Sequence, residues 1–387
     1  MKKTIACSLL FLFTLSLSFL SCTSEKKEQA PKATNVIYMI GDGMALPQVF
    51  AAMLATGDDM TFTQFPYIGV VDTRSISNTI TDSAAGGTAL ACDKKTKNGM
   101  VGMDSDTLAM ETILEALADQ GKSTGIVVTC YSGHATPADF YAKVPKRNMY
   151  EDIAVQMAES EKLNVMIGGG RKHFTNRSDS TDLIVRMVEE LGWKVYDTLD
   201  NIDTTCMKYA VLANKGHMPH YPERGEFLPN GVKTALKTLE QDEDGFFLMV
   251  EGSQIDFACH AHDSAWMVNE MIDFNNAVQV ALDYAKTHDN TLVVVTADHE
   301  TGGLTMIDRQ GKYTNVEFDY STGSHTCLPV MIYAYGPGAE LFTGWMQNNE
   351  VKAKILKACG IEPQELSTDM DQEIAPVVGN FDTRITE

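Results

Sequence analysis

Five segments that lie far apart in this chain carry side chains able to bind a metal ion or attack a substrate. They centre on Asp42, on Ser83, on Glu251 with Asp256 and His260, on Asp298 with His299, and on His325. Ser83 opens a run of small residues that predicts the start of a helix, where backbone N–H groups and the helix dipole favour negative charge. A serine nucleophile with such a ligand set indicates metal-assisted transfer of a phosphoryl group.

The spacing of these residues indicates which of them could share an ion. Asp256 and His260 are four residues apart, which puts them on one face of a helix. Asp298 and His299 follow an apolar run, and a pair of glycines just beyond allows the turn that both need to reach one ion. Each motif alone is equally typical of a turn, a surface hydrogen bond or a solvated loop. The interpretation therefore depends on their combination.

The chemistry of the candidate ligands indicates two kinds of ion. Imidazole nitrogens mixed with carboxylates suit zinc. Glu251 and Thr136 add oxygen ligands of the kind that magnesium prefers. Arg147 lies in a basic segment and could hold two phosphate oxygens at once, although a solvated arginine is the alternative.

Strands and helices alternate along the chain and must position these residues. Short apolar runs rich in β-branched residues predict strands at 35–40, 125–129, 164–167, 246–250, 291–296 and 330–335. Amphipathic stretches predict helices at 106–120, 150–160, 180–192, 230–241 and 265–288. This order predicts an α/β fold, a three-layer α/β/α sandwich with a central, mostly parallel sheet. Several candidates follow predicted strand ends, where such sheets form their sites, and they are Asp42, His134, Thr136, Glu251, Asp298 and His299.

Composition excludes some classes of protein. The chain has 387 residues, 44% of them hydrophobic, and a net charge of −21. A nucleic-acid or anionic-membrane surface is not expected at this charge. Six cysteines lie beyond residue 22, which leaves free thiols and disulfides both open, and they are Cys92, Cys130, Cys206, Cys259, Cys327 and Cys359. Cys259 and Cys327 neighbour candidate ligands, so metal binding by either is a further alternative.

The N-terminus predicts export. Two lysines precede an apolar run that is typical of a signal peptide over residues 1–21, and Cys22 follows as in a bacterial lipoprotein. We expect cleavage before Cys22, a lipid anchor on it, and a polar tether over 22–34. Residues 19–21 match the lipobox only loosely, so ordinary signal-peptide cleavage without a lipid is the alternative. Residues 35–387 are expected to form the catalytic domain, with an irregular insertion around 201–229.

Seven motifs, taken together and in order, resemble the alkaline phosphatase family. They span residues 36 to about 338 and read IGDGM, TDSAA, GHATPA, IGGGRK, VEGSQID, TADHE and GSHT. The resemblance implies that Ser83 is the nucleophile, forming a phosphoserine, and that Arg147 binds phosphate. It also implies three metal sites: a first zinc on Asp256, His260 and His325, a second zinc on Asp42, Asp298 and His299, and a magnesium on Asp42, Thr136 and Glu251.

Two residues depart from familiar members of this family. His134 stands beside the third site where some members have aspartate, and Phe257 stands where basic or histidine side chains occur. The third site could therefore hold another divalent ion. The remaining histidines match no ligand position and are interpreted as structural or solvated.

The resemblance implies an exported enzyme, periplasmic or anchored to the outer membrane, that hydrolyses small phosphate monoesters. Many members of the family are homodimers. Two alternatives are a phosphodiesterase of the same superfamily and a non-enzymatic lipoprotein that binds phosphate or zinc. A sulfatase is not expected, because the sequence after Ser83 lacks the proline and arginine of a sulfatase motif.

Overall fold

The computed structural model describes residues 32–312 and 316–362, and a ten-stranded sheet lies at their centre. In the described sheet only β13 runs against its neighbours, pairing antiparallel with β8 and β2, and the other pairings are parallel. The strand order is β14 (Gly344–Gln347), β2 (Tyr67–Asp72), β13 (Val330–Tyr335), β8 (Thr291–Thr296), β1 (Asn35–Gly41), β7 (Phe246–Gly252), β3 (Ser123–Tyr131), β4 (Val165–Gly169), β6 (Tyr209–Leu212) and β5 (Lys194–Tyr196).

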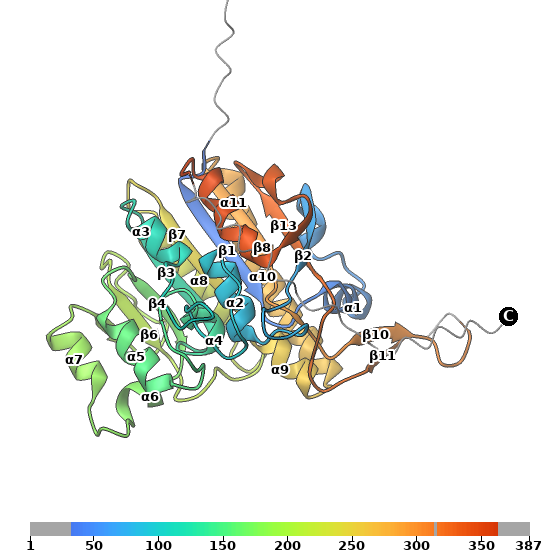
Figure 1. The fold of residues 1–387 in the computed structure, drawn as a ribbon, viewed down its shortest axis with the longest axis horizontal. Coiled ribbons are helices and arrows are strands. Elements are labelled where there is room, and N and C mark those ends of the chain that lie inside the picture. The colour runs from blue at the N-terminus through green and yellow to red at the C-terminus, as the bar shows by residue number, and fades with distance from the viewer. Residues whose placement is uncertain (1–31, 313–315, 363–387) are drawn as a thin grey trace, which may run out of the picture. The chain divides into compact units, whose positions relative to one another are not determined.

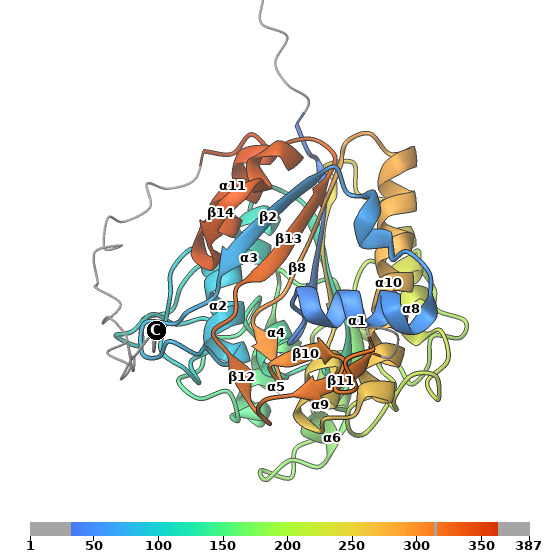
Figure 2. The same ribbon diagram turned by 90° about the vertical axis from the view of Figure 1, so that its right-hand side faces the viewer.

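Helices cover both faces of this sheet (Figures 1 and 2). One layer contains α1 (Leu46–Thr56), η1 (Thr61–Gln64), α8 (Phe227–Leu239), α9 (Gln254–His260) and α10 (Ser264–Thr287). The other contains α2 (Ser83–Cys92), α3 (Ile113–Ala118), α4 (Ala135–Ala138), η2 (Ala339–Phe342), η3 (Asn348–Glu350) and α11 (Val351–Ala358). Near β4, β6 and β5 lie α5 (Tyr150–Glu159), α6 (Lys172–Thr175) and α7 (Leu183–Glu189). The predicted three-layer α/β/α sandwich is confirmed.

Two small ribbons lie beside the main sheet. One pairs β10 (Leu304–Ile307) with β11 (Glu317–Tyr320), and the other pairs β9 (Glu300–Thr301) with β12 (His325–Thr326). The second ribbon joins His325 to Thr301 in antiparallel register. It thereby brings a histidine from a late loop close to the turn that follows β8.

The central strands form because their apolar residues are covered on both sides. Every residue of β1, β7 and β8 is buried, as expected for parallel strands between two helical layers. The three strands end at the same height in the sheet, because Ile40 in β1 pairs with both Glu251 in β7 and Thr296 in β8. Residues that follow these positions therefore emerge at one edge of the sheet.

All six predicted strands are present, and the predicted helices differ mainly at their ends. The helix expected over 106–120 is reduced to α3, because residues 103 and 109 form a β-bridge just before it. The sequence analysis did not predict α1, β2 or β14. Segment 201–229, expected to be irregular, contains β6, which extends the main sheet between β4 and β5. The strands β2, β6 and β14 are too short to produce a periodic pattern of apolar residues in the sequence.

The predicted signal peptide, residues 1–21, and most of the tether lie outside the described residues. The end of the tether is bound to the domain, because Ala33 N–H donates to the Ala358 carbonyl and Thr34 N–H to that of Asn290. Among the helices of the described part, none combines the length and the apolar character needed to cross a bilayer.

Candidate active site

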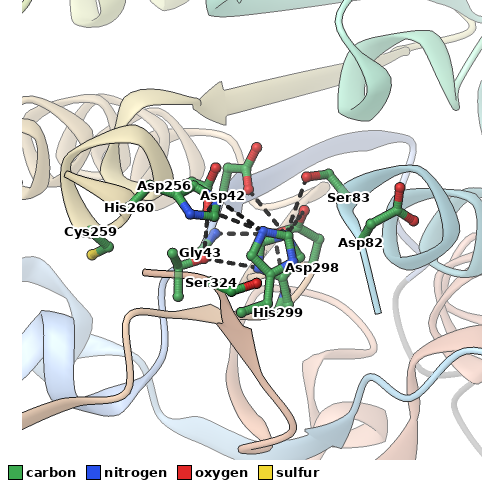
Figure 3. Close-up of polar contacts among 12 residues, drawn as sticks. Asp42, Gly43, Asp82, Ser83, Asp256, Cys259, His260, Asp298, His299 and Ser324 are labelled. Carbon is green, nitrogen blue, oxygen red and sulfur yellow. Dashed lines mark hydrogen bonds and ion pairs between the residues drawn. The ribbon is translucent and has the colours of Figure 1, made fainter. Parts of the chain in front are cut away.

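Ser83 is the first residue of α2 and is almost fully buried at the carboxyl edge of the sheet. The preceding Asp82 caps the helix by accepting a hydrogen bond from Ala85 N–H at 3.0 Å. Ser83 Oγ lies 3.2 Å from His299 Nε2 (Figure 3). The cap directs Asp82 away from this contact, so the serine hydroxyl alone faces the group of predicted ligands.

The residues expected at the second zinc site meet behind Ser83. Asp42 follows β1, and Asp298 and His299 follow β8. His299 Nε2 lies 3.2 Å from Asp298 Oδ2 and 3.5 Å from Asp42 Oδ1. The other Asp298 oxygen accepts hydrogen bonds from the backbone N–H groups of Gly43 and His299. Ligand atoms of Asp42, Asp298 and His299 all lie within 4.8 Å of one another.

The residues expected at the first zinc site meet next to it. Asp256 Oδ1 lies 3.2 Å from His260 Nε2 and 3.6 Å from His325 Nε2, and these two nitrogens are 3.1 Å apart. Each histidine donates its Nδ1–H to a backbone carbonyl at 2.8 Å, His260 to Gly323 and His325 to Thr81. Because a carbonyl only accepts, both Nε2 atoms are directed at the site as potential ligands.

The residues expected at the third site are buried beneath the sheet edge. Glu251 is the last residue but one of β7, and Thr136 lies in α4, two residues after His134. Glu251 Oε2 accepts hydrogen bonds from Ser253 Oγ at 2.6 Å and from Cys130 Sγ at 3.2 Å. Ligand atoms of Cys130, His134 and Glu251 lie within 4.8 Å of one another, which makes a third potential metal group in the described chain.

Several buried polar atoms of these groups find no hydrogen-bond partner in the described chain. They are both carboxylate oxygens of Asp42, Asp298 Oδ2, Glu251 Oε1, Thr136 Oγ1 and His134 Nδ1. Buried polar groups without partners are costly, and buried charges normally pair or bind metal. The donors are oxygens and nitrogens of types that bind zinc and magnesium. The residues present therefore fit divalent ions.

The pKa values of these groups are shifted mainly by burial and then by their charged neighbours. Burial, and then the neighbouring carboxylates, raise the pKa of Asp42 well above its usual value. Burial likewise raises the pKa of both Asp298 and Glu251 to about 7. Burial opposes the ionisation of Asp256 too, but its contacts with His260 and two other histidines lower its pKa below normal. Asp256 raises the pKa of His260 to about 9.

Arg147 is held over the start of α2 by Asp82. Its Nη1 lies 3.1 Å from Asp82 Oδ2, and 28% of the Arg147 side chain and 21% of the Asp82 side chain are exposed. Burial opposes its charge, but Asp82 and the more distant Asp42 and Asp139 raise its pKa. The guanidinium thus stays charged beside the serine, as binding of a phosphate anion requires.

Sequence reasoning missed three residues that the structure brings to these groups. Thr301 Oγ1 donates to Asp256 Oδ1 at 2.5 Å and lies 3.2 Å from His299 Nδ1, so it joins two ligand groups. Asp82 holds Arg147 and caps α2. Cys130 contacts Glu251. Of these, only Asp82 had a sequence signal, because aspartate is a common residue just before a helix.

The six described cysteines are all free thiols. The two that sequence reasoning considered as metal ligands do not join the candidate groups of the described chain. Cys259 Sγ is near Gln48 Nε2 at 3.9 Å, and Cys327 is exposed. The thiol that does meet candidate ligands is Cys130, 121 residues away from Glu251 in the sequence.

Comparison with known proteins places this arrangement in a family. The family model described as "Alkaline phosphatase" matches residues 33–316. The chain belongs to the alkaline phosphatase family. Alkaline phosphatase 3 of Bacillus subtilis is 30% identical, with 87% of this chain and 91% of that protein covered. Alkaline phosphatase 4 of the same organism is 35% identical over 73% of this chain and 65% of that protein.

Solved structures of alkaline phosphatases have the same fold. The enzyme of the Antarctic bacterium TAB5 has a TM-score of 0.83 and 38% identity, covering 87% of this chain and all of that one. A TAB5 variant with a histidine replaced by aspartate was solved with magnesium in its M3 site, and it superposes with a TM-score of 0.82 at 36% identity over the same shares of the two chains. The present alkaline phosphatase is therefore an enzyme that hydrolyses phosphate monoesters. Neither the diesterase nor the non-enzymatic alternative is favoured.

Proposed function

We propose that this alkaline phosphatase transfers the phosphoryl group of a monoester first to Ser83 and then to water, in a site with two zinc ions and a third divalent ion. The first zinc is held by Asp256, His260 and His325, and the second by Asp42, Asp298 and His299. The third ion is held by Asp42, Thr136 and Glu251, with His134 beside it. Magnesium in the M3 site of the TAB5 variant supports a divalent ion in this third position.

One observation carries this proposal. Ser83 Oγ touches His299 Nε2, while the surrounding carboxylates of Asp42 and Asp298 keep buried oxygens without hydrogen bonds. A site that only captured phosphate would have no use for a serine hydroxyl at this position. A nucleophile beside a cluster of unsatisfied metal ligands is the arrangement that covalent, metal-assisted phosphoryl transfer requires.

The first displacement forms a bond between Ser83 Oγ and phosphorus while the ester P–O bond breaks and the alcohol departs. The Ser83 hydroxyl gives up its proton, which reaches the departing oxygen by way of solvent to complete the alcohol, and the positive end of α2 favours negative charge on Oγ during the attack. When bound, the zinc ions would stabilise charge on the attacking and leaving oxygens and lower the pKa of water. In the second displacement, a water oxygen attacks phosphorus and Ser83 Oγ leaves. Two in-line displacements give net retention of configuration at phosphorus.

Arg147 positions the phosphoryl group throughout both steps. Its guanidinium can donate two parallel hydrogen bonds to phosphate oxygens, and Asp82 fixes the plane of that group. The transition state of phosphoryl transfer is loose, so the chain contributes mainly orientation and charge. His260 and His325 each keep Nε2 directed at the site because a backbone carbonyl accepts the Nδ1 proton.

The test is mass spectrometry of acid-quenched enzyme mixed with a chromogenic phosphate monoester, with wild type beside Ser83→Ala. A phosphate increment is expected on the peptide that contains Ser83, and the variant should lose both the increment and turnover. Ser77→Ala, which changes an exposed serine six residues earlier, is the control and should retain both. Full turnover in Ser83→Ala without any adduct would overturn the proposal.

We also propose export, cleavage before Cys22 and lipid anchoring on that cysteine, with the enzyme facing the periplasm or held at the outer membrane. The polar tether is long enough to separate the domain from a lipid surface. Metabolic labelling with a fatty acid tests this, because Cys22→Ala should lose the label and enter the soluble fraction. Homodimer formation stays a prediction, for which the measurement is the molar mass in solution.

A further inference from the structure

The third candidate site contains a thiol that the proposed function does not use. Cys130 is fully buried in β3, and its Sγ lies 3.2 Å from Glu251 Oε2. The register places Val128 of β3 opposite Glu251 of β7, so two residues further along the strand the thiol reaches the glutamate. Cys130 therefore lies just beyond the last β3–β7 pair, where the pairing of β3 with β4 also shifts its register.

The same site has three ligand atoms without hydrogen bonds in the described chain. Glu251 is fully buried, and its Oε1 has no partner, although its Oε2 has two. His134 is 8% exposed, and its Nδ1 is likewise unpartnered, as is the hydroxyl of the fully buried Thr136. The Cys130 thiol lies 3.2 Å from both Glu251 Oε2 and the Tyr131 carbonyl oxygen, and neither contact satisfies any of the three atoms. A cation among them would satisfy all three.

We propose that Cys130 Sγ is a ligand of the third ion, and that this site consequently selects zinc or a similar borderline ion over magnesium. This inference rests on the third metal site of the proposed function. When the ion binds, a bond forms between Cys130 Sγ and the metal, the S–H bond breaks, and its proton leaves to solvent. No oxidation or reduction is involved.

The types of ligand atom at the third site determine whether it prefers zinc or magnesium. Magnesium takes oxygen ligands in octahedral geometry, whereas zinc takes sulfur, nitrogen and carboxylate oxygen in a tetrahedron. Ligand atoms about 2.0–2.3 Å from zinc are roughly 3.5 Å apart. Ligand atoms of Cys130, His134 and Glu251 already lie within 4.8 Å of one another, so small side-chain movements complete the site. Thr136 supplies a further oxygen nearby.

The test uses cobalt as a spectroscopic probe in the full exported enzyme. The protein is stripped with a chelator and titrated with Co²⁺, and the near-ultraviolet absorption is followed for the sulfur-to-cobalt charge-transfer band. Cobalt bound only by nitrogen and oxygen gives no such band. We expect an absorption band whose intensity at three bound equivalents corresponds to one thiolate-bound cobalt per chain, and we expect zinc to displace it while a large excess of magnesium does not.

Variants assign the band to one thiol. Cys130→Ala should abolish it and weaken binding of the third equivalent at least about tenfold, since even indirect contacts to metal ligands are worth about 10–100-fold. Cys130→Ser, which keeps a hydrogen-bonding group of similar size, should also lack the band and serves if the alanine variant folds poorly. Cys92→Ala changes a buried thiol of α2 and should retain the band.

Three outcomes would overturn the inference. They are a band that survives in Cys130→Ala, a band that disappears in Cys259→Ala instead, and no band in wild type saturated with three equivalents. The readout does not depend on catalysis. If the Ser83 adduct forms while the band is absent, only this inference fails, and if the band forms without the adduct, only the proposed mechanism fails.

Discussion

Arg147 and Asp82 are joined by an ion pair of 3.1 Å whose carboxylate also caps the helix that begins at Ser83. One side chain therefore holds both Arg147, the proposed phosphate-binding cation, and the start of the helix that carries Ser83, the proposed nucleophile. Gly99 N–H donates to both oxygens of the same carboxylate, at 3.1 and 3.0 Å, which holds it in place.

The first prediction separates these two roles of Asp82. Asp82→Asn keeps a capping oxygen but removes the charge, so Arg147 loses its fixed orientation. The pair is partly exposed and worth about 1 kcal/mol, so the inhibition constant for inorganic phosphate should rise about fivefold. Asp82→Ala should show the same rise and also lose about 1 kcal/mol of unfolding free energy with the cap. Unchanged phosphate inhibition in both variants would contradict the assigned role.

The second prediction concerns Thr301, which acts through the ligands that it contacts. Thr301→Val keeps the shape but removes the hydrogen bonds to Asp256 and His299. Loss of such an outer contact typically weakens metal binding about 10–100-fold. Zinc retention in a chelator titration measures this, and Thr301→Ser should restore it. Equal retention in the valine and serine variants would argue for a packing role alone.

The third prediction tests the close approach between α2 and the turn after β8. A Cβ atom on Gly86 would lie 2.8 Å from the backbone oxygen of Asp298. Gly86→Ala should therefore displace Asp298, although alanine favours a helix by about 1 kcal/mol. A shift of Asp298 that relieves this contact can reduce turnover by up to about a hundredfold.

The control for this variant is Gly57→Ala. Gly57 has a left-handed backbone but open space around it, so its substitution should cost about 1–2 kcal/mol in stability and leave turnover unchanged. Full activity in Gly86→Ala would show that the turn adjusts without moving Asp298.

The fourth prediction concerns metal removal and pH. Burial raises the pKa of Asp298 and Glu251 to about 7 in the metal-free fold, whereas in the unfolded chain such groups titrate near pH ~4. Between these values the folded state holds protons that the unfolded state releases, so the free energy of unfolding falls as pH rises from about 4 to about 7. Bound ions replace those protons and should flatten this dependence.

Thermal unfolding from about pH 5 to pH 8, with chelator and with added zinc and magnesium, measures the effect. The melting temperature of the chelated enzyme should fall with increasing pH more steeply than that of the loaded enzyme. Asp298→Asn should reduce the slope of the chelated curve. Parallel curves for the chelated and loaded enzyme would refute the prediction.

The fifth prediction concerns a buried ion network remote from the ligand groups. The Arg224 guanidinium pairs with Glu270 and, at 2.6 Å, with Asp273, and all three side chains are almost fully buried. Arg224→Met would leave two carboxylates without a cation, which should cost about 3–5 kcal/mol of unfolding free energy. Lys194→Met breaks an exposed pair with Asp203 and should cost about 0–1 kcal/mol. Denaturant titrations measure both, and equal losses would contradict the distinction.

The positions of the strands and of several ligands could be predicted from the sequence. Asp42, Glu251 and Asp298 each end or follow an apolar run, and parallel strands put such ends at one edge. The start of α2 at Ser83 was predicted from another local signal, the run of small residues that begins there. The structure brings side chains of the first two predicted sites close together, with Asp256 Oδ1 3.2 Å from His260 Nε2 and Asp298 Oδ2 3.2 Å from His299 Nε2.

Other features had no local signal. The strands β6 and β14 are four residues each, and they are strands because a neighbour in the sheet supplies their hydrogen bonds. Thr301 and Cys130 stand in ordinary strand sequence, and their importance comes from partners 45 and 121 residues away.

The sequence by itself determined the fold class, the family and the order in which ligand-bearing segments follow buried strands, because these depend on local periodicity and motif order. Only the tertiary structure decided which polar atoms stay without partners, which carboxylate holds Arg147 and which thiol meets Glu251. Those relationships depend on strand register and on packing between distant segments, and a difference of one residue in register would separate Cys130 from Glu251.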